Sequence, residues 1–156
     1  MSLPLLRSTL CCVISASLLG CDSPTERRLA EAIARGPGTV IDLDSLAPGD
    51  WTRLYVLNPY TSGGTADSVL GFHWRGFERW ELHLRDDINL LVFVDGTDVK
   101  HDIAFRRGHG DFCCFERNAS YQRSRAKFVV IVDGQSATGQ PWYRLRHVDV
   151  PVSNDG

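Results

Sequence analysis

The sequence predicts an α+β fold, in one compact domain with a mainly antiparallel sheet of about five to seven strands and one or two short helices. Two runs, the apolar residues 90–94 and the mostly apolar residues 127–132, are typical of buried strands. An Asp-Gly pair follows each run, Asp95-Gly96 and Asp133-Gly134, and this pair is a strong signal for a hairpin turn. Strands joined by hairpins favour an antiparallel sheet.

The first 20 residues have the layout of a secretion signal. One cation, Arg7, precedes a mostly apolar run, residues 9–19, which is shorter than the roughly 20 residues that span a bilayer. The ending Leu18-Leu19-Gly20-Cys21 resembles the lipobox of bacterial lipoproteins. The resemblance implies cleavage before Cys21, a diacylglyceryl thioether on its sulfur and acylation of its new amino group. An ordinary cleaved signal and an uncleaved anchor are the alternatives.

A lipid on Cys21 would place the protein on a bacterial cell membrane, facing the periplasm. Stable anchoring takes at least two acyl chains, which this modification supplies. Asp22 resembles the sorting signal that keeps lipoproteins on the inner membrane. Export and a formal net charge of −2 both argue against nucleic acid as a partner. Beyond the membrane, the expected partner is another envelope protein, and no cofactor other than the covalent lipid is expected.

Residues 21–49 are predicted to hold the lipidated cysteine, a short helix and a linker. Ser23 can cap the helix, Pro24 suits its first position, and Gly36 and Pro37 end it. Since the helix has little apolar surface, we expect a loosely docked stalk. A short strand over residues 39–43 is expected inside the linker, and the compact domain is expected to cover residues 50–152.

Within the compact domain, the pattern predicts further elements in order. A short helix over residues 66–70 is expected to be capped by Thr65 and ended by Gly71. His101 alternates with Val99, Ile103 and Phe105, so it is expected to point inward as a hydrogen-bonded core histidine. The other predicted strands are residues 51–57, 80–84 with one wet face, 99–105, 112–115 as a short strand or turn, and 142–148.

Scattered positions in residues 50–115 resemble a pattern found in small secreted bacterial proteins and lipoproteins. The group has no assigned activity, so the resemblance implies one envelope domain and no catalytic residues. The positions are Trp51, Asn58-Pro59-Tyr60-Thr61, Leu70-Gly71, Trp74, the run over residues 87–94, and Gly110-Asp111-Phe112.

After the signal, the stretch around His109 and Asp111 is the richest in side chains that could bind a metal or take part in a reaction. With Cys113 and Cys114 these residues offer imidazole, carboxylate and thiolate groups, which ligate Zn²⁺. Their spacing matches no known ligand pair, so no metal and no catalytic residue are predicted. On a strand, Cys113 and Cys114 would point to opposite faces, one buried and one half-exposed. A vicinal disulfide and a bridge to another chain are the alternatives.

The absence of a catalytic motif favours an interaction module over an enzyme. Loops on a rigid sheet carry binding more often than strands do, and residues 58–64 and 106–111 are predicted loops. The candidate binding residues in them are Tyr60, Arg107 and His109. The alternative function is a small redox or metal-binding envelope protein that uses His109, Asp111, Cys113 and Cys114. The basic segment over residues 106–127 is a further candidate surface for anionic head groups or an acidic partner.

Overall fold

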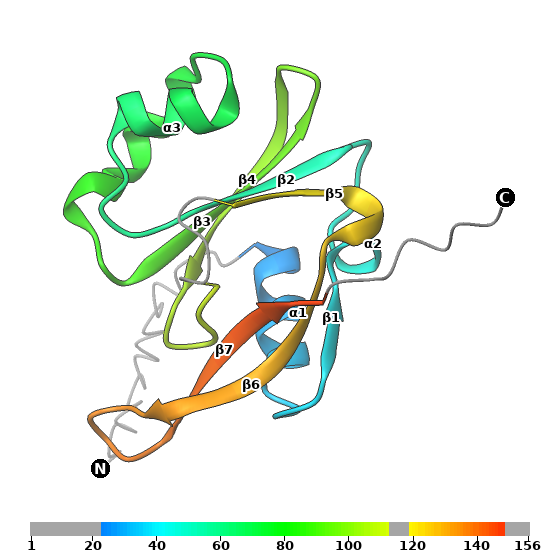
Figure 1. Cartoon of the computed structure of the whole chain (residues 1–156), viewed down its shortest axis with the longest axis vertical. Helices are drawn as coiled ribbons and strands as arrows, with labels where there is room; N and C mark the ends of the chain where they lie inside the picture. Colours follow the sequence, from blue (N-terminus) through cyan, green and yellow to red (C-terminus); the bar gives the residue numbers. More distant parts are fainter. Residues whose placement is uncertain (1–22, 113–118, 149–156) are drawn as a thin grey trace, which may run out of the picture.

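A computed structural model describes residues 23–112 and 119–148 and confirms the α+β class (Figure 1). The described residues form seven strands in two antiparallel sheets. The three-stranded sheet has the order β1-β6-β7, with strands β1 (Val40–Asp42), β6 (Lys127–Gln135) and β7 (Pro141–His147). The four-stranded sheet has the order β4-β3-β2-β5, with strands β2 (Arg53–Leu57), β3 (Ile88–Asp95), β4 (Asp98–Arg106) and β5 (Ala119–Gln122).

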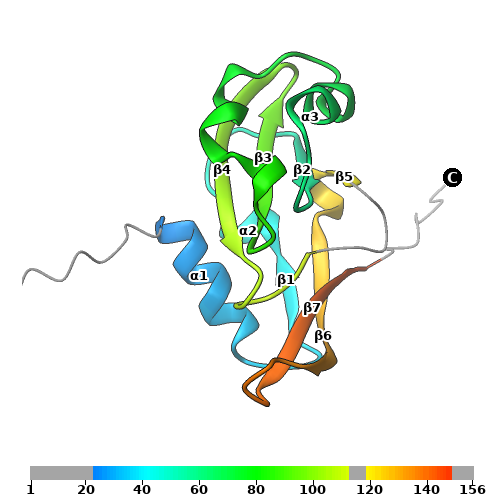
Figure 2. The same ribbon diagram turned by 90° about the vertical axis from the view of Figure 1, so that its left-hand side faces the viewer.

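The four-stranded sheet is covered on both faces, which explains why residues 90–94 of β3 are all apolar. Leu91 and Phe93 face a core that the sheet shares with helix α1 (Pro24–Ile33) and with the three-stranded sheet. Leu90 and Val92 face a second core under helix α3 (Gly63–Leu70) and the 3₁₀ helices η1 (Arg75–Trp80) and η2 (Leu82–Leu84). In Figure 2, α3 lies at the top of the molecule and α1 lies lower, on the left.

Helix α1 belongs to the core, so the expectation of a loosely docked stalk is wrong. Ser23 caps it as predicted, its hydroxyl accepting a hydrogen bond from the Glu26 N–H at 3.1 Å. Its few apolar side chains share one face, and Leu29 and Ile33 are both 0% exposed. The segment after α1 is also packed: β1 pairs with β6, and Leu43 in the short helix α2 (Leu43–Leu46) is buried. The core therefore begins well before Asp50, where the sequence placed its boundary.

The predicted strand over residues 80–84 is a pair of 3₁₀ helices. Glu81 has a φ of 47°, which interrupts an extended backbone between η1 and η2. Leu82 is buried, whereas Leu84 is 70% exposed, so the alternation does not mark a half-buried strand. The helix predicted over residues 66–70 starts earlier, capped by Ser62, and ends at Gly71 as expected.

One of the two predicted Asp-Gly turns is correct. Asp95-Gly96 joins β3 to β4, and Gly96 has a φ of 60°. Asp133-Gly134 instead lies where the register between β6 and β7 shifts, so it marks a bulge. The turn itself comes later, where the N–H of Ser136 donates to the carbonyl of Gln140. A bulge and a turn share the same residue preferences, and the sequence does not separate them.

Candidate functional site

Three loops meet at one end of the four-stranded sheet. Leu57, the last residue of β2, pairs with Leu90, and Ile88, the first residue of β3, pairs with Arg106 at the end of β4. The loops over residues 58–62, 81–87 and 106–111 therefore adjoin, and we call them together the loop end. Two of them hold the candidates Tyr60, Arg107 and His109. Their proximity depends on strand order, which the sequence alone does not reveal.

Tyr60 projects from the loop end on a strained but well-held backbone. Its side chain is 65% exposed and its φ is 64°, a value that residues other than glycine, asparagine and aspartate rarely adopt. Its N–H donates to the carbonyls of Leu82, at 2.9 Å, and Arg85, at 3.2 Å. Below it, the hydroxyl of Thr61 donates to the Asn58 carbonyl at 2.7 Å. These bonds hold the backbone around Tyr60, whose ring is exposed to solvent.

Leu84 lies on the neighbouring loop, and sequence reasoning missed it. It is the most exposed large apolar residue described, at 70%. Its loop carries Glu81, which with Tyr60 makes up the non-glycine residues of positive φ in the described ranges. Such strain persists only where surrounding structure determines it, and it concentrates at functional sites. The loop end thus presents Tyr60 and Leu84 on two loops that are bonded to each other.

Arg107 links two of the loops at the loop end through hydrogen bonds of its guanidinium group. Its guanidinium donates to the Asp86 carbonyl and to Asp111 Oδ2, both at 2.7 Å. Asp111 is 0% exposed, and its hydrogen bond is the main reason why the pKa of Arg107 is raised. The charges of Asp111 and Asp86 raise this pKa further, while burial opposes the rise. The sequence predicts Arg107 as a binding residue. In the structure, its side chain also holds the loop end in place through the hydrogen bonds to Asp86 and Asp111.

The alternative site around His109 is only partly described, because Cys113 and Cys114 lie outside the described residues. His109 is exposed, with its ring edge-on to Phe105 at 6.1 Å. The Asp111 carboxylate is taken by Arg107, so binding a metal would cost that ion pair. No cluster of three or more histidine, cysteine, aspartate or glutamate side chains suited to a metal occurs within residues 23–112 and 119–148.

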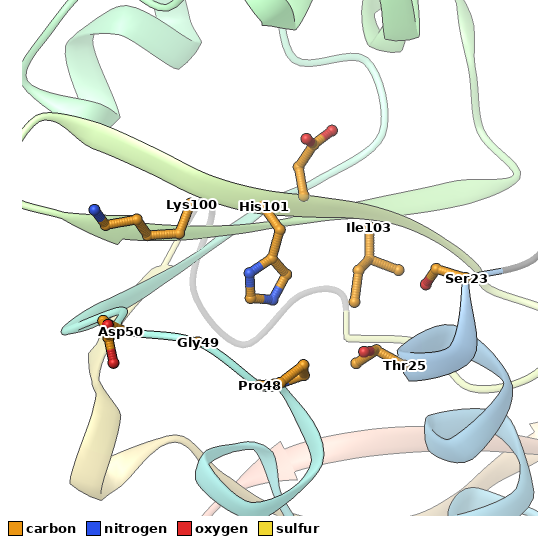
Figure 3. A pocket seen from close by; sticks show the side chains of 9 residues that line it. Ser23, Thr25, Pro48, Gly49, Asp50, Lys100, His101 and Ile103 are labelled. Atoms are coloured by element: carbon orange, nitrogen blue, oxygen red, sulfur yellow. The ribbon is translucent and has the colours of Figure 1, made fainter.

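A pocket of about 510 Å³ lies between β4, the start of α1 and the turn over residues 48–50 (Figure 3). His101 projects into it from β4, and its ring stacks on Phe93 at 4.2 Å. His101 points inward as predicted, but its buried Nε2 has no hydrogen-bond partner among the described residues, contrary to expectation. Burial lowers the pKa of His101, and the Asp102 charge opposes this. The alternating pattern of β4 predicted that His101 points inward. It gave no indication that the start of α1 and the turn over residues 48–50 form the other pocket walls.

Comparisons with known proteins leave the chain without an assigned family. No family model matches it, and no curated protein or solved structure does so. The resemblances to bacterial lipoproteins and to small secreted proteins therefore stay predictions. Across the described part of the chain, every helix is too short or too polar to cross a membrane.

Proposed function

We propose that this chain is a lipid-anchored protein of the bacterial envelope that binds another envelope protein through the loop end. The observation that carries the binding role is the exposure of Tyr60 and Leu84 on loops held by hydrogen bonds. The lipobox resemblance at residues 18–21 supports the anchor, and Asp22 favours the periplasmic face of the inner membrane. The activity proposed is binding, with no catalytic step.

The charges of the loop end indicate what kind of contact it makes. Arg85 is bonded to Asp87 through two nitrogens, at 2.8 and 2.6 Å, and Arg107 is bonded to Asp111. These two pairs are compensated within the chain, so Tyr60 and Leu84 are the large exposed apolar side chains left to a partner, while Glu81, Asp86 and Arg106 are exposed around them. Tyrosine is enriched at binding hot spots. We therefore expect the partner to offer an apolar depression that receives Tyr60 and Leu84.

Position-specific photo-crosslinking in cells tests the binding role. A benzophenone amino acid at position 60 or 84 should give the same covalent adduct, while the same probe at Val132, which is 52% exposed, should not. Tyr60→Asn should weaken the adduct formed from position 84, because asparagine tolerates the positive φ but lacks the ring. An equal adduct from position 132, or none from 60 and 84, would refute the loop end as the binding surface.

The anchor has its own test. Cys21→Ala should abolish incorporation of an alkyne-labelled palmitate and leave an unprocessed precursor. The position-60 adduct should then also disappear, because the domain is no longer processed and seated on its membrane. If palmitate is still incorporated, the lipid is not on Cys21. The two tests address separate claims. If the lipid is not on Cys21, binding through the loop end is not excluded.

A further inference from the structure

The pocket beside His101 holds two polar groups without a partner. The buried Nε2 of His101 neither accepts a hydrogen bond from any described residue nor donates one. Asp50, which lines the same pocket, is exposed and makes no ion pair there with any described residue. Ile103 and Pro48 supply apolar wall. A volume of about 510 Å³ falls in the range of roughly 300–1,000 Å³ typical of small-molecule sites.

The charges on the pocket wall favour a cation. Lys100 also lines the pocket, but its ammonium is bonded to Asp98 at 2.7 Å, which is the main cause of its raised pKa. Asp95 and Asp50 raise that pKa further. Lys100 is therefore paired mainly with Asp98, outside the pocket. Asp50 makes no ion pair with a described residue, so the charge on the pocket wall is net negative.

Two other groups near the pocket do not reverse this balance. The start of α1 carries a partial positive charge of about half a unit, less than one carboxylate, and Glu26 lies in its first turn. Asp102 is engaged by Arg79 and by the Trp80 indole, each at 2.6 Å or less. The field at the wall is thus set mainly by Asp50, and among the described residues that line the pocket an anion would find no unpaired cation.

The hydrogen-bonding state of His101 agrees with a donor ligand. Because burial disfavours the imidazolium, the pKa of His101 is lowered and the ring is neutral at neutral pH. A neutral imidazole has one nitrogen with a free lone pair, which accepts an N–H or O–H. In Figure 3 the ring lies between Asp50 on one side and Ile103 on the other.

We propose that this pocket is a binding site for a small primary amine that carries an apolar body. The ammonium group lies against the Asp50 carboxylate beside the His101 ring, and the apolar body packs against Ile103 and Pro48. The site is separate from the loop end, so the proposal is independent of the proposed partner.

Three probes of matched shape test the proposal: butylamine, butanol and butyrate. Each is titrated into the full protein, purified from membranes in mild detergent, while the backbone amide resonances of β4 are followed. Butylamine should give saturable shifts at Lys100 to Ile103 and bind about fivefold or more tightly than butanol, which is the gain of one partly exposed ion pair. Butyrate should bind more weakly than butanol. Equal or tighter binding of butyrate, or no saturable shift in β4, would overturn the proposal.

Matched variants assign the roles. Asp50→Asn should reduce butylamine binding to the level of butanol, and Glu31→Gln, the same change on the exposed face of α1, should leave it unchanged. His101→Phe keeps a ring on Phe93 but removes both ring nitrogens, so butylamine and butanol should both bind more weakly. Asp98→Asn frees Lys100 and should lower the preference for the amine. Unchanged butylamine binding in Asp50→Asn, with the fold intact by circular dichroism, would show that Asp50 does not select the ligand.

Discussion

Leu29→Ala tests whether α1 is part of the folded body. Leu29 is fully buried in the core that also contains Phe93 and Phe128. Truncating a buried leucine removes its transfer energy and leaves a cavity, at a cost of about 2–5 kcal/mol. A domain of this size has roughly 5–15 kcal/mol in total, so the loss is a large fraction. With a typical dependence on denaturant, the urea midpoint should fall by roughly 1 M or more.

The assay is urea unfolding followed by tryptophan fluorescence, since Trp51 is buried in the same core. Glu31→Ala is the matched control on the same helix, because Glu31 is exposed and its loss should change stability by less than about 0.5 kcal/mol. If Leu29→Ala unfolds at the same urea concentration as Glu31→Ala, α1 is a stalk after all.

Three further predictions rest on other contacts. A Cβ on Gly110 would lie 2.8 Å from Leu145 and 2.9 Å from Ile33, so Gly110→Ala should cost about 1–3 kcal/mol. Gly108→Ala, where nothing lies within 4 Å, should be nearly neutral in the same urea titration. Arg107→Ala removes the guanidinium from the buried Asp111 and should cost about 3–5 kcal/mol of stability. Arg85→Ala, in an exposed pair, should cost less than about 1 kcal/mol. Equal urea midpoints for the two variants would contradict a structural role for the Arg107–Asp111 ion pair. The folded-state pKa of His101 is below its ordinary value of 6.5, so the unfolded chain binds the proton more readily. Its contribution to stability is present above pH 6.5 and is lost as the pH falls through the lowered pKa. His101→Phe should therefore flatten the fall of the urea midpoint between pH 7 and pH 5, and an unchanged slope would refute this assignment.

The parts of the fold that sequence predicts well are those where local pattern and tertiary environment agree. Residues 90–94 are apolar on both faces because both faces of β3 are covered, and Asp95-Gly96 turns where a two-residue turn is required. Ser23 caps α1 through a local hydrogen bond that needs nothing from the rest of the chain. Patterns of this kind carry their own physical cause.

The features that sequence misses are set by contacts distant along the chain. Helix α1 has few apolar residues, yet its side chains fill a gap between the sheets, where Ile33 lies close to Gly110. The alternation over residues 80–84 resembles a strand, but the positive φ of Glu81 and the bonds from Tyr60 hold it in short helical turns. The loop end depends on strand order, and the pocket depends on three segments that meet. Neither leaves a signal in any one stretch of sequence.

Packing α1 into the core also restricts how the proposed anchor would present the domain. Cys21 is two residues from Ser23, which lines the pocket, and two extended residues reach only about 7 Å. A lipid on Cys21 would therefore hold the pocket close to the membrane surface, without the helix and linker over residues 21–49 that the sequence predicted between anchor and domain. A domain held so closely has little freedom to reach a partner away from that surface. The partner of Tyr60 and Leu84 is then expected in the same membrane or resting on it, and lengthening the chain after Cys21 with a flexible Gly-Ser linker should reduce the crosslink from position 60.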